Sequence, residues 1–222
     1  MLTHPGWHEV PGLRHGFLDR AECAGGLGEA VAGVGVTLPL ALPRQVHGVR
    51  VVAAAAGERP EADGLLTDTP GRVVGVVTAD CVPVLLVARD TRVAAAVHAG
   101  WRGAAGGVLE AAVREMAARG AETARIEAAI GPAVGACCYE VGGDVRDAFV
   151  ARTGDVTADA WSGPTGDKYH VDLRRAVSLL LGAAGVRATT VLGPCTACTP
   201  TYCSYRRDGA GAGRQLSFVG WS

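Results

Sequence analysis

The stretch Arg72-Val-Val-Gly-Val-Val-Thr-Ala-Asp-Cys-Val-Pro-Val-Leu-Leu-Val-Ala-Arg-Asp-Thr-Arg-Val-Ala-Ala-Ala-Val-His-Ala-Gly100 decides the fold of this 222-residue chain. It contains three apolar runs, 72–78, 82–88 and 93–98, and each has the length and the Val-rich composition of a buried strand. The residues Arg-Asp-Thr-Arg at 89–92 separate the second run from the third and suffice for a hairpin turn. The stretch therefore predicts a sheet that is at least partly antiparallel.

The sequence on either side adds helices to this sheet. After Gly103, apolar residues recur at helical spacing until Gly120. The residues on that face are Val108, Leu109, Ala112, Val113 and Met116. Shorter helices are predicted over 144–152 and from an N-cap at Asp172 through Leu181. Further strands are predicted over 49–56, 126–130, 186–192 and 215–220, and 153–168 is predicted to be an irregular surface loop, as its Gly, Asp, Thr and Pro content favours turns.

These elements predict one α/β (α+β) domain over residues 1–222, with helices packed over a largely antiparallel mixed sheet. Hydrophobic residues make up 49% of the chain and aromatic residues only 5%, so the core must consist mainly of Val, Leu and Ala. Basic and acidic residues nearly balance, at 21 against 22, which argues against binding to nucleic acid or to a membrane surface.

The sequence predicts neither a secretory signal nor a membrane span. No basic N-terminal segment leads into an apolar run, and the apolar runs fall short of the ~20 residues that a membrane span needs. Seven Cys without an export signal indicate reduced thiols rather than disulfides. We therefore expect a soluble cytoplasmic protein, whose oligomeric state the sequence leaves open.

Three side chains in apolar settings point to one site. Cys81 and His98 each follow a strand-like run, and His47 in Gln-Val-His-Gly precedes the run 49–56. A thiolate and two imidazoles could hold zinc and leave its fourth position open for water or substrate. Equally, His98 could draw the proton from Cys81 in a metal-free nucleophilic pair, or the three residues could simply pack in the core. The spacing of the residues leaves these alternatives open.

Arginines in the neighbouring motifs suit an anion. Arg102, in His-Ala-Gly-Trp-Arg-Gly, stands where a helix is expected to begin, and Arg206 and Arg207 offer planar donor groups that match phosphate. Asp80, next to Cys81, could orient a metal ligand or cap a turn.

The remaining thiols and imidazoles carry weaker signals. Cys195-Thr-Ala-Cys198 is a lone CxxC, and a closed zinc site would need a second pair, so we predict structural thiols here and at Cys203. The adjacent Cys137 and Cys138 are given no role. Four histidines in polar or Gly-rich surroundings are predicted to lie at the surface. They are His4, His8, His15 and His170.

Several motifs, in order along nearly the whole chain, resemble the YfiH-like family. The most specific are Thr-Ala-Asp-Cys (78–81) and His-Ala-Gly-Trp-Arg-Gly (98–103). The others are Gln-Val-His-Gly (45–48), Ala-Asp-Gly-Leu-Leu-Thr (62–67), Ile-Gly-Pro-Ala-Val-Gly (130–135), Tyr-Glu-Val-Gly (139–142), Lys-Tyr-His-Val-Asp-Leu (168–173) and Ser-Tyr-Arg-Arg-Asp (204–208). The resemblance implies a layered α/β sandwich related to Cys–His hydrolases.

The resemblance also implies an activity. This family, formerly labelled multicopper polyphenol oxidase or laccase, is described as zinc-dependent purine nucleoside phosphorylase with adenosine deaminase activity. By resemblance, His47, Cys81 and His98 correspond to its zinc ligands, and Arg20 in Gly16-Phe-Leu-Asp-Arg20 corresponds to an arginine that faces substrate. The implied substrates are adenosine, inosine, guanosine or methylthioadenosine, together with phosphate.

Other functions give different expectations. Copper oxidation of phenols by a four-copper centre needs roughly ten His, because copper favours imidazole-rich sites, and this chain has six His. A Cys–His amide hydrolase acting on peptidoglycan precursors is an alternative enzyme, and it should survive strong chelation. A zinc-dependent binding protein is the non-enzymatic alternative, and it would hold zinc without turning over nucleosides.

Overall fold

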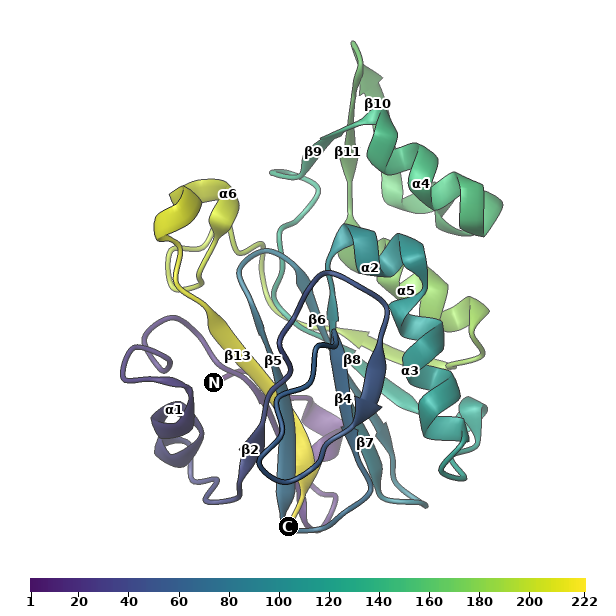
Figure 1. Ribbon diagram of the computed structural model, residues 1–222. Coiled ribbons are helices and arrows are strands. Elements are labelled where there is room, and N and C mark those ends of the chain that lie inside the picture. Colours follow the sequence, from purple (N-terminus) through teal and green to yellow (C-terminus); the bar gives the residue numbers. More distant parts are fainter.

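Two β-sheets packed face to face form the centre of the computed structural model, which describes residues 1–222 (Figure 1). The first sheet has the order β1 (Leu13–Phe17), β13 (Gln215–Trp221), β5 (Arg72–Thr78) and β2 (Leu40–Ala41). The second has the order β12 (Ala188–Val191), β8 (Glu127–Ile130), β6 (Val82–Ala88), β7 (Val93–Ala99), β4 (Gly64–Thr67) and β3 (Val51–Ala53). A small separate sheet consists of β10 (Trp161–Thr165), β11 (Lys168–Val171) and β9 (Glu140–Gly142).

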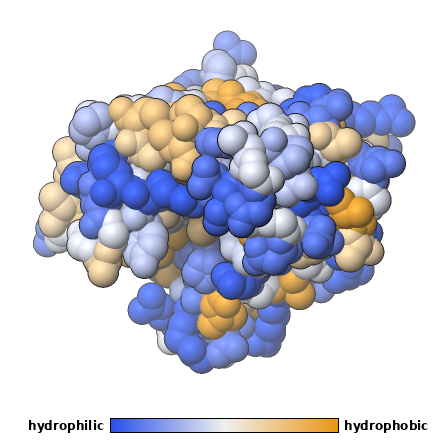
Figure 2. All heavy atoms as spheres, turned by 90° about the horizontal axis from the view of Figure 1, so that it is seen from above, coloured by the Kyte–Doolittle hydropathy of each residue, from blue (hydrophilic) through white to orange (hydrophobic).

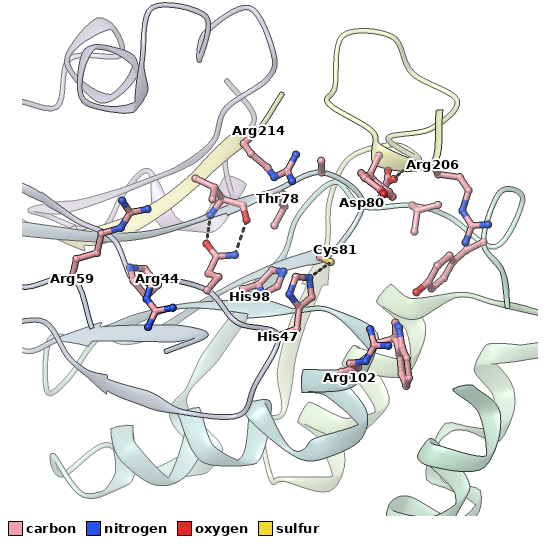
Figure 3. Close-up of a pocket in the computed structure, with 18 residues that line it drawn as sticks. Arg44, His47, Arg59, Thr78, Asp80, Cys81, His98, Arg102, Arg206 and Arg214 are labelled. Atoms are coloured by element: carbon pink, nitrogen blue, oxygen red, sulfur yellow. Dashed lines mark hydrogen bonds between the residues drawn. The ribbon is translucent and has the colours of Figure 1, made fainter. Parts of the chain in front are cut away.

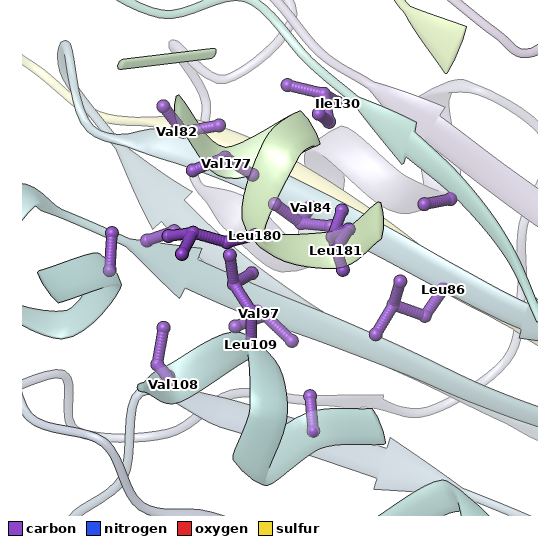
Figure 4. Close-up of a cluster of buried hydrophobic side chains, with 14 of the residues drawn as sticks. Val82, Val84, Leu86, Val97, Val108, Leu109, Ile130, Val177, Leu180 and Leu181 are labelled. Atoms are coloured by element: carbon purple, nitrogen blue, oxygen red, sulfur yellow. The ribbon is translucent and has the colours of Figure 1, made fainter. Parts of the chain in front are cut away.

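Helices cover the outer faces of both large sheets. The helix α1 (Leu27–Gly33) packs on the four-stranded sheet, and α3 (Val108–Ala117) and α5 (Leu173–Ala183) pack on the six-stranded sheet (Figures 1 and 4). The remaining helices are α2 (Trp101–Gly106), α4 (Gly143–Thr153) and the short α6 (Tyr205–Asp208), with 3-10 turns at Pro5–Trp7, Thr123–Arg125, Gly154–Ala160 and Gly209–Gly211. The predicted layered α/β fold is therefore confirmed.

Strand β6 shows why the central residues are apolar on both faces. Leu85 and Val87 face the core between the two sheets, whereas Val84 and Leu86 face α3 and α5 (Figure 4). All seven residues of this strand are buried. Strands β6 and β7 pair antiparallel from Val82↔Ala99 to Ala88↔Val93, so the predicted hairpin is confirmed.

The arrangement of strands and helices departs from the sequence predictions in three places. The apolar runs 72–78 and 82–88 lie in different sheets, because the chain crosses between the sheets at residues 79–81. The helix expected from Gly103 to Gly120 is two helices, α2 and α3, since Gly107 has φ +103° and ends the first. Residues 153–168 are not irregular: they contain a 3-10 turn and strand β10.

None of the helices combines the length and the apolar composition that crossing a bilayer requires.

The prediction that His15 lies at the surface is wrong. This side chain on β1 is only 7% exposed, its Nε2 accepts a hydrogen bond of 3.0 Å from the His4 backbone N–H, and the ring of Trp7 lies edge-on 5.2 Å away. Burial lowers the pKa of His15 from 6.5 to about 4, and the neighbouring His8 adds to the decrease. His15 is therefore neutral in the folded protein at neutral pH.

We expect acid to destabilise the fold through His15. Its pKa is lower in the folded state, so the unfolded chain takes up the proton first, and stability decreases as the pH falls from 6.5 to about 4. The difference between these two pKa values corresponds to a loss of up to about 3 kcal/mol, with no further loss from this group below about pH 4. Urea unfolding of the wild type and of His15→Gln at pH 7 and pH 4.5 measures the effect. Equal pH dependence in both proteins would contradict it.

Candidate active site

His47, Cys81 and His98 come together at the end of the two sheets where the chain crosses from β5 to β6 (Figure 3). Cys81 lies in the crossover, His98 lies near the end of β7, and His47 lies in the loop before β3. Their potential ligand atoms all lie within 4.8 Å of one another, and Cys81 Sγ lies 4.0 Å from His47 Nε2. The three residues singled out in the sequence thus form one cluster.

Asp63, which the sequence analysis missed, orients His98. It immediately precedes β4, whose pairing with β7 (Gly64↔Val97) places Asp63 opposite His98. The His98 Nδ1–H donates to Asp63 Oδ1 over 2.8 Å, and the His98 backbone N–H donates to the Asp63 carbonyl over 2.7 Å. With Nδ1 engaged, Nε2 of His98 is left to face Cys81. Hydrogen bonding to a carboxylate is a common way of orienting a metal-binding histidine.

The same carboxylate holds the loop that carries His47. The backbone N–H groups of Val46, His47 and Gly48 donate to Asp63 over 3.3, 2.9 and 2.6 Å. His47 has φ +61°, a conformation that is uncommon for a residue with a side chain. These three hydrogen bonds stabilise that conformation, so one buried aspartate positions both histidines.

The electrostatics favour a thiolate at Cys81. Burial raises the pKa of the Cys81 thiol, but hydrogen bonds to His47 and His98 outweigh burial and lower that pKa to about 6. For His98, burial lowers the pKa, but hydrogen bonds to Asp63 and Cys81 outweigh it and raise that pKa to about 9. Burial also raises the pKa of Asp63, yet the His98 hydrogen bond and the backbone donors bring it below its ordinary value.

The cluster has room for a metal ion and the donors to bind one. A Cβ added at Gly100 would lie 3.1 Å from the His47 ring and 3.2 Å from Cys81 Sγ, so the glycine keeps the space beside the ligands open. Two imidazoles and one thiolate are a donor set typical of catalytic zinc, in which the fourth position remains open.

The cluster opens into a cavity of about 620 Å³, a size typical of small-molecule sites. Its wall carries five arginines, namely Arg44, Arg59, Arg102, Arg206 and Arg214, and three large aromatic side chains, Trp101, Tyr139 and Tyr205. The only carboxylate in the wall is that of Asp80. Seen from above, this end of the molecule is largely hydrophilic, and its hydrophobic residues form separate patches (Figure 2). The cavity therefore suits a polar, negatively charged ligand with a flat ring.

Asp80 anchors the cavity wall and does not orient a metal ligand. Its Oδ1 accepts a 2.6 Å hydrogen bond from the Thr196 hydroxyl, and its Oδ2 accepts one of 2.6 Å from the Arg206 backbone N–H. Asp80 has φ +84° in the crossover. It ties the crossover both to the loop before α6 and to α6 itself, so Asp80 makes an anchoring contact in place of the metal-orienting contact offered as an alternative.

The predicted arginines divide into two groups. Arg102 and Arg206 line the cavity, with guanidinium carbons 4.4 Å from the Trp101 ring centre and 5.2 Å from that of Tyr139, respectively. Arg102 forms no ion pair or side-chain hydrogen bond within the chain, which leaves its guanidinium available to a ligand.

Arg20 and Arg207 are not in the cavity wall. Both guanidinium groups bind Asp208, and Arg207 also donates to backbone carbonyls of the loop 196–202. The Asp208 carboxylate binds both cations. Hydrogen bonds from Arg207, and to a lesser extent from Arg20, lower the pKa of this carboxylate to about 2. Arg20 and Arg207 therefore stabilise the loop 196–202 and do not face the cavity.

Three further arginines of the wall were not predicted from the sequence, namely Arg44, Arg59 and Arg214. Arg44 stands three residues before His47, and this closeness to a site motif was a signal that the sequence offered. Arg214 directly precedes β13, away from those motifs, so the sequence offered no such signal for it. For Asp63, the signal was an acidic residue directly before an apolar strand within Ala-Asp-Gly-Leu-Leu-Thr. Buried carboxylates of that kind need partners.

Comparison with known proteins identifies the family of the chain. The profile of the family described as multi-copper polyphenol oxidoreductase laccase matches residues 26–222. The chain belongs to this laccase family. Among its relatives, adenosine deaminase RL5 from an unknown prokaryotic organism is 39% identical over 196 residues, which cover 81% of this chain and 74% of the relative. A purine nucleoside phosphorylase of Deinococcus radiodurans is 41% identical over 177 residues, which cover 79% of this chain and 68% of the relative.

The fold is shared with a solved crystal structure. The crystal structure of Neisseria meningitidis protein NMB0706 superposes with a TM-score of 0.79 at 39% sequence identity. The match covers 86% of this chain and 78% of that one. The resemblance to the YfiH-like family, noted from the motifs, is confirmed.

Proposed function

We propose that this chain is a zinc-dependent purine nucleoside phosphorylase that also deaminates adenosine. The observation that carries the proposal is the cluster of His47, Cys81 and His98 at the floor of a cavity rich in arginine and aromatic side chains. Relatives about 40% identical that are named purine nucleoside phosphorylase and adenosine deaminase support the same reaction class.

The ligand set proposed for zinc is His47, Cys81 and His98. Zinc bound there would act as a Lewis acid toward an oxygen nucleophile, phosphate in phosphorolysis and water in deamination. Asp63 keeps the His98 ring in the tautomer that leaves Nε2 free, and it holds the His47 loop in place. The thiolate character of Cys81 suits a metal ligand, because a metal must otherwise displace the thiol proton.

The residues of the cavity wall support a purine nucleoside and phosphate as substrates. In phosphorolysis a phosphate oxygen forms a bond to the ribose C1′ as the bond from C1′ to the purine nitrogen breaks, and the base leaves with the bonding electrons and takes up a proton. Arg102 and Arg206 would neutralise the phosphate and the charge that develops during this step. The rings of Trp101, Tyr139 and Tyr205 offer flat apolar surfaces for the base and the sugar.

The direct test is an assay of purified, zinc-replete protein with inosine and phosphate. We expect hypoxanthine and ribose 1-phosphate in equal amounts, and inosine with ammonia when adenosine and water are supplied. Chelation should remove both activities, and added zinc should restore them. If the zinc-replete protein releases no base from inosine, guanosine, adenosine or methylthioadenosine, the proposal is wrong.

We expect Arg102→Ala to weaken the use of phosphate. Loss of one charged hydrogen-bond donor costs about 1.5–3 kcal/mol, which corresponds to a rise of roughly 10- to 100-fold in KM for phosphate. KM for inosine should change much less. Steady-state kinetics measure both values, with Arg114→Ala, an exposed arginine on α3, as the matched control. An unchanged KM for phosphate would show that Arg102 does not bind phosphate.

One observation favours a second candidate. Cys81, His98 and Asp63 also have the order of a nucleophile, a base and an orienting carboxylate, which is the arrangement of Cys–His amide hydrolases. Chelation separates the two functions, because hydrolysis of an amide by a Cys81 thiolate would survive loss of the metal, whereas phosphorolysis would stop.

The donor set fits the oxidase label of the family poorly. The site offers two imidazoles and one thiolate. The other four histidines lie elsewhere: His4, His8 and His15 belong to the N-terminal segment, and His170 bonds the Ala136 carbonyl over 2.7 Å. A four-copper centre, with its roughly ten imidazoles, cannot be assembled from these residues.

A further inference from the structure

Four cysteines from two distant segments meet beside the cavity. Cys137 and Cys138 lie shortly before β9, and Cys195 and Cys198 lie between β12 and α6. All four sulfurs lie within 4.8 Å of one another. The prediction of structural thiols at Cys195, Cys198 and Cys203 did not foresee that the adjacent pair Cys137 and Cys138 joins the CxxC in a four-thiol cluster, from which Cys203 is absent.

The distances between these sulfurs match ligands of one ion. Cys138 Sγ and Cys137 Sγ lie 3.3 and 3.6 Å from Cys198 Sγ. Four thiolates placed tetrahedrally at a Zn–S distance of about 2.3 Å have their sulfurs about 3.8 Å apart. A disulfide would require about 2.05 Å between two of them. The spacing therefore fits a tetrahedral ion better than covalent sulfur pairs.

Backbone contacts bring the two segments into register. Ala133 forms a parallel bridge with Cys195, and the Thr196 N–H donates to the Ala133 carbonyl over 3.0 Å. The Gly135 N–H donates to Cys195 Sγ over 3.1 Å, a contact that stabilises a thiolate. A Cβ at Gly135 would lie 3.4 Å from Cys137 Sγ and 3.2 Å from Cys195 Cβ, so the glycine leaves room for the cluster.

We propose that Cys137, Cys138, Cys195 and Cys198 form a second zinc site, separate from the cluster of His47, Cys81 and His98. Four thiolates fill the coordination shell of zinc and leave no open position, which is the property of a structural site. Two of the sulfurs belong to exposed residues, so zinc can enter from solvent. Binding of zinc with four thiols releases the four thiol protons and changes no oxidation state.

The position of this second site explains what it would stabilise. One segment that it joins carries Val134 and Tyr139, which line the cavity. The other carries Thr196, whose hydroxyl bonds Asp80 beside Cys81. Arg206, which follows on α6, lies over the Tyr139 ring and donates to the Glu140 carbonyl over 3.1 Å. The four-thiol site would thus link the segment that carries Val134 and Tyr139 to the segment that leads into α6, and so stabilise the cavity wall between them.

Metal analysis of full-length protein, prepared with a reductant and dialysed against zinc, tests the proposal. The wild type should hold two zinc ions per chain. Cys198→Ser should lose one of them and keep the other, and Cys81→Ala should show the converse loss. Cys198→His should recover the lost ion, because three thiolates and an imidazole also bind structural zinc. Cys23→Ser, which changes a thiol outside both clusters, should keep both ions.

A spectroscopic measurement identifies the ligands independently of folding or activity. Cobalt(II) bound to Cys81→Ala should give the intense thiolate-to-cobalt absorption of a four-sulfur site, and Cys198→Ser should lose most of it. The exposed thiols of Cys137 and Cys198 should resist alkylation in the zinc-loaded protein and react after chelation. The proposal is overturned if Cys198→Ser keeps the full zinc content, if the reduced cluster binds iron in preference to zinc, or if its cysteines form disulfides under reductant. None of these outcomes depends on nucleoside turnover.

Discussion

Replacing Cys81 with alanine is expected to remove more than about 99% of the phosphorylase activity. Even residues that only support metal ligands cost about 10- to 100-fold when they are changed, and Cys81 is itself in the ligand cluster. Loss of the thiolate also leaves His47 and His98 as the only donors, too few to hold zinc against competition from solvent. Release of hypoxanthine from inosine, measured together with zinc content, tests this expectation.

The control for Cys81→Ala is Cys23→Ala, which removes a thiol that belongs to neither cysteine-containing cluster. This control should keep both activity and zinc. Full turnover by Cys81→Ala would exclude the thiolate from the chemistry. Loss of turnover with full retention of zinc would instead favour the Cys–His hydrolase type of mechanism, in which the sulfur attacks the substrate.

Replacing Asp63 with asparagine is expected to have the second-largest effect. Oδ1 of Asp63 accepts from the His47 N–H and from the His98 ring, and Oδ2 accepts from the Val46 and Gly48 N–H groups. The asparagine amide has only one oxygen, so its NH₂ group must take the place of one carboxylate oxygen. That NH₂ group cannot accept hydrogen bonds, so the two donors that the replaced oxygen served lose their partner. Each buried donor left without a partner costs about 1–3 kcal/mol.

The consequences should reach both metal binding and stability. Zinc affinity or turnover should fall by about 10- to 100-fold, because the His98 ring is no longer held in one tautomer. The free energy of unfolding should also fall, as the His47 loop loses contacts that maintain its positive φ. Zinc titration and urea unfolding measure the two effects. Asp68→Asn, at an exposed aspartate, is the matched control. If Asp63→Asn equals the wild type in both measurements, Asp63 has no positioning role.

Much of the second sheet could be predicted from the sequence. Residues 82–99 alternate between two buried faces and are joined by a short polar turn, so the local pattern is sufficient for the hairpin β6–β7. The same pattern cannot tell which sheet a strand joins. Strand β5 is as apolar as β6, yet its antiparallel partner is β13, more than 130 residues later in the chain. Packing of the whole chain, rather than local periodicity, selects that partner.

The site shows the same division. His47, Cys81 and His98 could be predicted as site residues from the sequence, because each is a polar side chain next to an apolar run. The role of Asp63 was not readable, since it depends on the pairing of β4 with β7 that places a carboxylate against a histidine. The burial of His15 and the separation of Arg20 and Arg207 from the cavity also depend on contacts between distant segments.

By itself the sequence determined the strands of the central hairpin, the layered class of the fold and the identity of three potential metal ligands. The tertiary structure alone decided which carboxylate orients them, which arginines face the cavity, and that two unrelated pairs of cysteines meet. The reason is physical: apolar periodicity is a local property, set by which face of each element is buried. Hydrogen bonds and sulfur–sulfur approaches such as that of Cys138 to Cys198 join residues far apart in the chain, and they exist only after the sheets have packed.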